Sequence, residues 1–238
     1  MRLPVALMFL VGGACADHGN EGFFIVNNSA AVAGGTCTFT PDLTEPFIAA
    51  GSISVDSPSG YVMAPLFDSN ITATDDQVNQ RSIHLQGANV HAEVANGGTH
   101  QDYTVLFSGT IFPNGGLTNA VVEMLPASSI QAFGNVNAAN NQNTEVVLTI
   151  TAYGTLGGGR IDAEPFYYPI TLVAPKNGLI RGIGYNSDGS INPTASQSCV
   201  GYSQVASPGN PCNAFQDGDV DCCFSPTLNE AVCPAVSE

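Results

Sequence analysis

The sequence predicts an all-β protein, an antiparallel two-sheet sandwich of the immunoglobulin-like or jelly-roll-like kind with a disulfide-stapled, irregular C-terminal tail. Three observations lead to this prediction. Apolar and polar residues alternate with a period of two in most apolar segments, and Gly, Pro and Asn separate these segments at short intervals. No stretch carries a sustained 3.6-residue apolar stripe. About nine short strands of this kind favour two stacked sheets over a closed barrel.

The clearest strand is residues 103–111, where the odd positions form an apolar face. The turn-forming sequence at 113–116 follows, and an apolar segment returns at 120–125, so the two segments are predicted to form a hairpin. Residues 145–153 are rich in Val, Thr and Ile and form another predicted strand.

Three glycines at 157–159 lead into residues 161–173, where four side chains share one face: Phe166, Tyr168, Ile170 and Leu172. Weaker strands are predicted at 23–26, 52–55, 61–66, 82–85 and 90–94, with one short turn of helix at 128–133. The Asn-rich segment 135–143 is predicted to be a solvated loop, with contact to a ligand as the alternative.

The first residues of the chain are typical of an export signal. Arg2 precedes an apolar run over residues 3–11, which is too short for a membrane-spanning helix. The small residues before Cys15 predict a signal peptide over 1–16 with lipid attachment at Cys15, although Gly12 stands where lipoprotein signals usually have Leu. The alternative is cleavage after Ala16, which discards the cysteine. Residues 17–21 would form a linker.

The cysteine count supports an oxidising compartment. The chain has seven cysteines, and either processing route removes Cys15 from pairing. The even number left is typical of disulfide-bonded proteins. These six are Cys37, Cys199, Cys212, Cys222, Cys223 and Cys233.

Five of these six lie in a Cys-rich tail, residues 176–238, which follows the predicted sandwich domain, residues 22–175. If all six pair, Cys37 must bond to a tail cysteine, and spacing does not say which. The alternative is a free, buried Cys37. In the chain-entropy model a loop of this length stabilises the fold by roughly 4–5 kcal/mol.

The charge balance excludes some partners. The formal net charge is −15, from 20 acidic residues and 5 basic ones. So few cations cannot neutralise phosphates, which argues against nucleic acid and against electrostatic docking to anionic lipid. The expected contact with a membrane is therefore the lipid on Cys15.

One acidic segment in the tail is a weak calcium candidate. Asp217, Asp219 and Asp221 alternate as in the first half of a calcium loop. Cys222 stands where that loop needs Gly and Leu228 where it needs Glu, which excludes an EF-hand. A solvated acidic turn is the alternative, and no other metal or cofactor is predicted.

Catalytic signatures are missing from the sequence: it has no nucleophile elbow, zinc-protease helix, phosphate loop or dinucleotide fingerprint. His84 and His91 fall on the polar faces of predicted strands and are expected to be solvated. The acidic residues on or beside strands are also expected to face solvent: Glu93, Asp102, Glu123, Glu145 and Asp162.

Several short motifs of the chain occur together in one group of proteins. They include Cys37-Thr38-Phe39, Gly51-Ser52-Ile53-Ser54-Val55, Arg81-Ser82-Ile83-His84-Leu85, Phe166-Tyr167-Tyr168-Pro169-Ile170 and Pro211-Cys212-Asn213-Ala214-Phe215. On these the chain resembles exported, often lipidated proteins of Gram-negative bacteria such as the myxobacteria, a group with no assigned molecular function. The resemblance implies export and lipidation. Similar proteins often have cysteines just after the last strand, where this chain has residues 173–178 without one.

These observations predict a non-enzymatic exported envelope protein with a structural or binding role. It would be anchored by lipid to the outer membrane, or alternatively be periplasmic or extracellular. A carbohydrate-binding module is the first alternative, although the chain has no Trp to stack on a sugar. An extracytoplasmic hydrolase with a dispersed site is the second.

Overall fold

The computed structural model describes residues 22–32, 37–55, 57–74, 81–95, 98–134 and 142–174. In the tail it describes 210, 212–213 and 215–217, and the backbone of 184–185, 191–192, 223–225 and 230–232. The predicted signal peptide and linker, residues 1–21, lie outside the described residues. Within the described residues, no helix combines the length and the apolar character needed to span a membrane.

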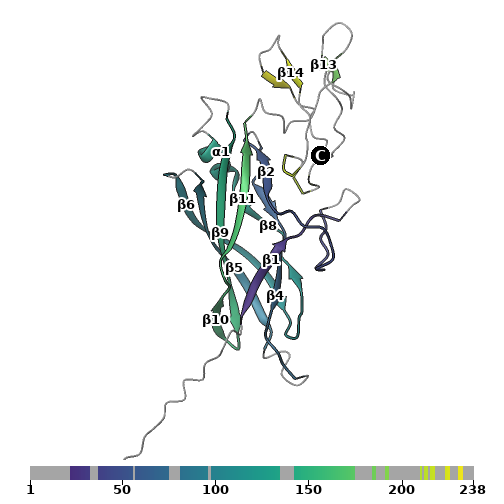
Figure 1. Cartoon of the computed structure of the whole chain (residues 1–238), viewed down its shortest axis with the longest axis vertical. Helices are drawn as coiled ribbons and strands as arrows, with labels where there is room; N and C mark the ends of the chain where they lie inside the picture. Colours follow the sequence, from purple (N-terminus) through teal and green to yellow (C-terminus); the bar gives the residue numbers. More distant parts are fainter. Residues whose placement is uncertain are drawn as a thin grey trace, which may run out of the picture.

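One curled, six-stranded sheet forms the frame of the molecule and has the shape of a half-barrel (Figure 1). Its strand order is β2-β11-β9-β5-β6, and β10 pairs with β9 beside this path. The strands are β2 (Gly51–Ser54), β5 (Ile83–Val94), β6 (His100–Ile111), β9 (Thr144–Leu156), β10 (Gly159–Asp162) and β11 (Phe166–Val173). All pairs are antiparallel except β2 with β11.

Smaller sheets and one helix complete the described structure. A three-stranded sheet has the order β1-β4-β7, and two-stranded sheets pair β3 with β8, β12 with β13 and β14 with β15. The elements are β1 (Phe23–Asn28), β3 (Tyr61–Met63), β4 (Pro65–Ser69), β7 (Thr118–Asn119), β8 (Val122–Leu125), α1 (Ala127–Gly134), β12 (Gly184–Tyr185), β13 (Ile191–Asn192), β14 (Cys223–Ser225) and β15 (Glu230–Val232).

The alternating pattern of the sequence places one face of each long strand in a single core. In β9 every second side chain from Val146 to Ala152 is fully buried. Side chains of the smaller sheets join the same cluster, among them Phe23, Phe67 and Met124. Burying such side chains stabilises the fold by roughly 1.5–3 kcal/mol each.

The predicted β-rich fold is confirmed, but its layout differs from the prediction. One curled sheet and several small ones are present where two comparable sheets were expected. The strands β5, β6 and β9 have 12 or 13 residues each, and strands of this length accumulate twist. The expectation of purely antiparallel pairing is wrong for β2, which reaches β11 only after more than a hundred residues of intervening chain and pairs with it in parallel.

The predicted hairpin between residues 103–111 and 120–125 is also wrong. β6 instead pairs with β5 along ten residues, directly after a short connection. The chain then crosses to the small sheets, where β7 pairs with β4 and β8 with β3. The two segments predicted at 82–85 and 90–94 are one strand, β5, with a bulge between Leu85 and Gly87. A Cβ on Gly87 would lie 2.4 Å from the carbonyl oxygen of Val105, so the bulge requires glycine.

Candidate functional site

The strand β6 lies at one end of the main sheet, and β5 is the only described strand paired with it. Two hydrogen bonds fix which peptide groups face outward. Val94 N–H donates to Thr99 O over 3.1 Å, and Ala95 N–H donates to Glu145 O over 2.9 Å. By the alternation of an antiparallel ladder, the even residues of β5 between the bulge and Val94 then bond to β6, and the odd ones bond to β9. It follows that the peptide groups of Asp102, Thr104 and Leu106 point away from the sheet.

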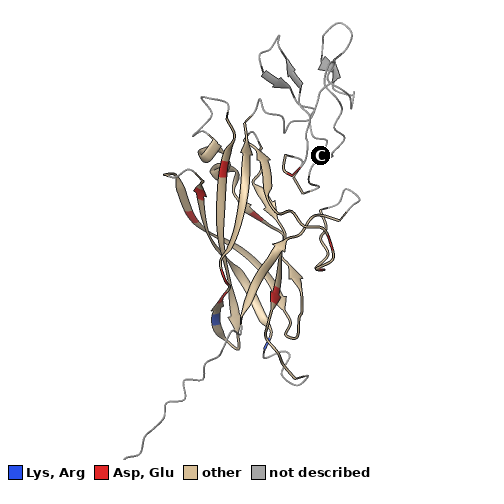
Figure 2. Ribbon diagram, in the orientation of Figure 1, with Lys and Arg blue, Asp and Glu red and all other residues tan. Residues whose placement is uncertain are grey.

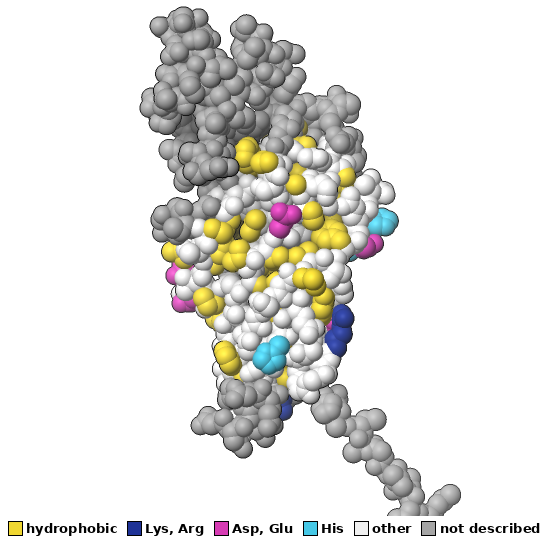
Figure 3. Space-filling model, turned by 180° about the vertical axis from the view of Figure 1, so that it is seen from behind, with side chains coloured by type: hydrophobic (Ala, Val, Ile, Leu, Met, Phe, Trp, Pro, Cys, Tyr) yellow, Lys and Arg dark blue, Asp and Glu magenta, His cyan; other side chains and the backbone are white. Residues whose placement is uncertain are grey.

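A groove of about 660 Å³ runs beside this free edge. Residues 101–106 of β6 form one wall, and four residues form the other: Glu123, Pro126, Ser128 and Ser129. Leu106 is 75% exposed, the largest value among the exposed large hydrophobic side chains of the described chain. Figure 3 shows the molecule from behind the view of Figure 1. Hydrophobic side chains gather across the middle of this face, with acidic side chains between them and at the sides.

Two side-chain contacts join β6 to the segment that forms the other wall of the groove. The hydroxyl of Tyr103 donates to the carbonyl oxygen of Met124 in β8 over 2.9 Å. Near the start of α1, the hydroxyl of Ser129 donates to the Gln101 side chain over 2.6 Å. Burial, helped by the nearby Glu123 carboxylate, raises the pKa of Tyr103, so this phenol remains a donor even in alkaline solution.

The acidic side chain in the far wall is held by the backbone. Gly60 N–H donates to Glu123 Oε2 over 3.1 Å, across the pairing of β3 with β8. A Cβ on Gly60 would lie 2.4 Å from the Glu123 side chain, so this close approach also depends on a glycine. The charge of Glu123 is therefore fixed at the rim of the groove.

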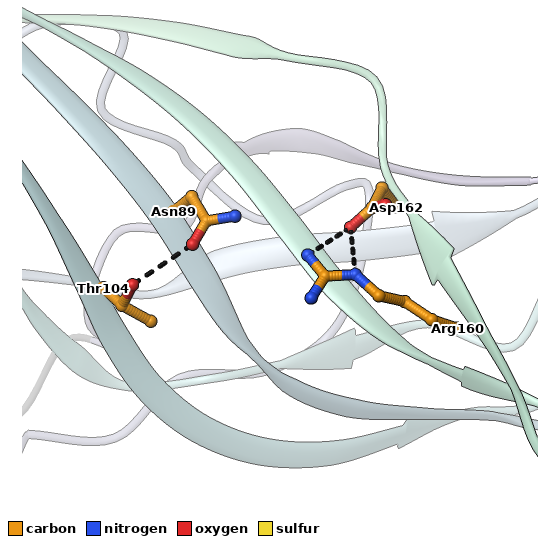
Figure 4. Close-up of polar contacts among 4 residues, drawn as sticks. All are labelled: Asn89, Thr104, Arg160 and Asp162. Carbon is orange, nitrogen blue, oxygen red and sulfur yellow. Dashed lines mark hydrogen bonds and ion pairs between the residues drawn. The ribbon is translucent and has the colours of Figure 1, made fainter.

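The outer face of the same strands carries cross-strand polar pairs. His91 Nδ1–H donates to Asp102 Oδ1 over 2.7 Å. The hydroxyl of Thr104 donates to Asn89 Oδ1 over 3.1 Å (Figure 4). The bond to Asp102, with a smaller contribution from Glu93, raises the pKa of His91. A hollow of about 370 Å³ lies over these pairs and continues to Thr149 and Thr151 of β9.

Two aromatic residues lie further along this outer face. Tyr167 of β11 is 66% exposed and is in register with Thr149. The guanidinium of Arg160 lies 4.4 Å from the ring centroid of Tyr153. It also donates to Asp162 Oδ1 over 2.8 Å (Figure 4). The outer face thus offers hydroxyl, amide and aromatic groups on one twisted surface.

The opposite edge of the sheet, strand β2, is covered by residues 215–217 of the tail. Cys37 forms a disulfide with Cys212, which brings the tail to this edge (Figure 1). Ser54 N–H donates to Phe215 O over 3.0 Å, and Asp217 N–H donates to Ser52 O over 2.9 Å. Residues 215–217 therefore act as a surrogate strand on β2.

Buried polar side chains hold this surrogate strand in place. Gln216 is fully buried, and its side-chain amide both accepts from Val62 N–H and donates to Val62 O, each over 2.8 Å. The hydroxyl of Tyr61 donates to the carboxylate of Asp217 at 2.8 Å and accepts from Tyr168 over 2.9 Å. Burial raises the pKa of Asp217 although its hydrogen bonds oppose the rise, and burial also raises that of Tyr61.

The structure describes only some of the residues singled out from the sequence. The expectation that Cys37 pairs with a tail cysteine is confirmed, with Cys212 as the partner and a separation of 175 residues. Of Cys223 only the backbone is described. The remaining candidates lie outside the described residues: Cys15, Cys199, Cys222, Cys233, Asp219 and Asp221.

Asp217, the first residue of the calcium candidate, is turned into the protein. Its carboxylate accepts hydrogen bonds from the side chains of Tyr61, Gln216 and Asn210 and from Ser52 N–H. A cation would have to displace these donors, so the contacts favour a structural role for this residue. Within the described part of the chain, no group of three or more His, Cys, Asp or Glu side chains is placed to hold a metal.

The groove residues were not predicted as a site. The alternation along residues 103–111 places Tyr103 on a core face, but the side chain is only half-buried because the sheet does not close beyond β6. Glu123 is exposed, as the sequence predicts, but its hydrogen bond with Gly60 N–H has no signal in the sequence. One signal was available: Leu106 is an apolar residue at an even position of a strand whose odd positions form the core face.

Comparisons with known proteins assign no family. No family model matches the chain, and no curated protein matches it significantly. A crystal structure of a protein from Archaeoglobus fulgidus is similar over 52% of this chain and 93% of its own, at 14% identity and a TM-score of 0.34. This likeness is too distant to carry an argument about fold or function.

Proposed function

We propose that the protein is an exported, non-enzymatic binding protein of the cell envelope, held at the outer membrane by lipid on Cys15. Its partner occupies the groove beside β6. The fold that presents this groove is described best as a two-layer sandwich, with the half-barrel sheet as one layer and the small sheets as the other.

The Cys37–Cys212 disulfide supports the export. Such bonds persist in oxidising compartments and are rare in the cytosol. The predicted signal peptide over 1–16 and the resemblance to exported, often lipidated proteins of Gram-negative bacteria point the same way. The periplasm or the extracellular medium is the alternative location if cleavage after Ala16 removes Cys15.

The observation that carries the binding role is the groove beside an unpaired strand edge. It combines an exposed apolar side chain, Leu106, with outward-pointing peptide groups and the fixed charge of Glu123. Apolar surface with a few placed polar groups is typical of binding sites. The carboxylates of Asp102 and Glu123 are bonded to His91 and Gly60, which favours a positioning role for them over catalysis.

Intact mass of the protein purified from the membranes of its producing cells tests this proposal. The expected mass is that of a chain beginning at an acylated Cys15, with six cysteines oxidised. A mass that begins at Asp17, without lipid, moves the protein to the periplasm or the medium. Retained Met1 with free thiols would contradict export altogether.

The outer face supports carbohydrate binding as a second candidate. Tyr167 is exposed, and the neighbouring hollow is lined by Asn89, Thr104, Thr149 and Thr151. Aromatic rings and hydroxyl or amide groups on one face suit a sugar. Selective binding on a glycan array that Tyr167→Ala abolishes and Leu106→Ala leaves unchanged would favour this candidate over the groove.

A further inference from the structure

We propose that the groove beside β6 takes an extended, basic peptide segment of another protein, which adds to β6 as a further antiparallel or parallel strand. The proposal rests on the proposed binding function and specifies its partner. In such additions the main chain supplies hydrogen bonds, and pockets for alternate side chains supply specificity.

The backbone geometry of β6 is suited to this addition. The peptide groups of Asp102, Thr104 and Leu106 point outward, and none of them takes part in a loop or inter-strand hydrogen bond among the described residues. The span from Asp102 to Leu106 is about 14 Å at the usual rise of a strand. A partner segment of about five residues would therefore pair with it.

The groove determines what the inward side chains of the partner meet. On an added strand, alternate side chains point to opposite faces. One set would lie over the groove against Tyr103, Val105 and Pro126, and the other would lie on the outer face beside Asp102, Thr104 and Leu106. A segment of alternating apolar and polar residues fits both surfaces.

The negative charges that line the groove favour a basic partner. The charged residues that line the groove are Asp102 and Glu123, both acidic, and the chain as a whole carries −15. Figure 2 shows acidic residues on several of the described elements and few basic ones. A Lys or Arg directed at Glu123 would find an anion already fixed by Gly60 N–H.

The same charges argue against a second copy of this chain. Two β6 edges paired about a twofold axis would bring both Asp102 carboxylates and both Glu123 carboxylates to one seam. Like charges placed across a strand pair are destabilising. Self-association is therefore an outcome of the test and not the proposal.

Fluorescence anisotropy with labelled ten-residue peptides tests the proposal on the full oxidised chain. The probe alternates Val and Thr and has one central Lys; a matched peptide has Glu in its place. We expect the Lys peptide to bind and the Glu peptide to bind at least about tenfold more weakly. No binding of the Lys peptide at concentrations up to about 1 mM would overturn the proposal.

Methylated peptides test for main-chain pairing. N-methyl groups on one alternate set of residues block the amides that face β6, and on the other set they block only amides that face solvent. We expect one set to abolish binding and the other to leave it unchanged. Equal loss of binding with both sets of methyl groups, or no loss with either set, would contradict strand addition.

Protein variants locate the contact. Glu123→Gln should lower the affinity for the Lys peptide by about threefold and remove the preference for the Lys peptide over the Glu peptide. The matched control is Glu164→Gln, an exposed acidic residue outside the groove lining, which should change neither. Thr104→Pro removes an outward N–H while the β5 ladder bonds remain, and it should abolish binding.

The outcomes separate this proposal from the proposed function. If the chain carries an acylated Cys15 but binds none of the peptides, strand addition is refuted and the proposed export and anchoring stand. Dimerisation seen by sedimentation and lost in Thr104→Pro would replace the peptide with a second copy of the chain. Selective glycan binding that depends on Tyr167 would move the site to the outer face.

Discussion

The two edges of the main sheet differ in what lies beside them. The edge at β2 is covered by residues 215–217, which are fixed by a disulfide and by buried polar side chains. The edge at β6 has no described strand on it and borders an open groove. An exposed edge invites pairing with other chains, so proteins usually cover or blunt it. A long edge left open in the same sheet is best explained by a role in binding another molecule.

Strand length explains why only one edge needs the tail. β2 has four residues and is held in the sheet by β11 alone among the named strands. β6 has twelve residues, and ten of them are in register with β5. A short edge strand gains stability from a partner on its far side, whereas β6 is held by its own hairpin.

Removal of the disulfide should produce the largest difference between the edges. We expect the double variant Cys37→Ser with Cys212→Ser to lose about 2–5 kcal/mol of unfolding free energy, measured by urea denaturation. Hydrogen exchange should show faster exchange at Ser54 N–H, which donates to Phe215 O, and no change in the β5–β6 ladder. Equal loss of protection at both edges would contradict their independence.

Gly51→Ala should disturb the β2 edge from inside. A Cβ at this position would lie 2.4 Å from the hydroxyl of Tyr61, which is fully buried and bonded to Asp217. We expect a loss of about 2–3 kcal/mol, measured by thermal or urea unfolding. Gly22→Ala is the matched control, because nothing lies within 4 Å of its Cβ position. A loss as large in the control would refute the steric explanation.

Tyr61→Phe should weaken the same edge by a smaller amount. The hydroxyl it removes links Tyr168 to the carboxylate of Asp217. We expect a cost of about 1–2 kcal/mol, because both partners lose a hydrogen bond in a largely buried place. Tyr167→Phe, at a 66% exposed site, should cost almost nothing. Comparable costs for the two variants in urea denaturation would mean that the buried network contributes no special stability.

The sequence predicts the strands of this fold better than its edges. Alternation along 145–153 and 166–172 predicts core faces correctly, because a period of two depends only on local geometry. The parity of the cysteines predicts that Cys37 pairs with the tail, but not that Cys212 is the partner. Pairing depends on which segments meet in space, and for that reason the hairpin after residue 111 was mispredicted.

The site escapes sequence analysis for the same reason. Tyr103 and Glu123 stand in ordinary strand patterns, and only the open side of the curled sheet makes them neighbours of a groove. Gln216 and Asp217 are part of a polar tail in the sequence, yet Gln216 forms a β-bridge with Ile53 and both residues belong to a buried hydrogen-bond network. Leu106, out of phase with its strand, is the one local sign of an unusual edge.

The polar pair beside the β6 edge should give the smallest effect, and it depends on pH. The bond to Asp102 raises the pKa of His91 in the folded state above its ordinary value of 6.5. The pair therefore stabilises the fold fully below about pH 6.5, and this stabilisation is lost as pH rises through the higher folded pKa. Because the His91 side chain is 41% exposed, solvent screening limits the gain to about 0.5 kcal/mol.

Urea denaturation of the wild type and His91→Gln at a series of pH values measures this contribution. The difference in unfolding free energy should be largest near about pH 5.5 and should fall toward zero near about pH 8.5. Asp102→Asn, which removes the main cause of the pKa shift, should flatten the profile in the same way. A difference that grows with pH would contradict the sign of the coupling. Exchange at Ser54 should stay unchanged throughout, since the β2 edge lies across the sheet from this pair.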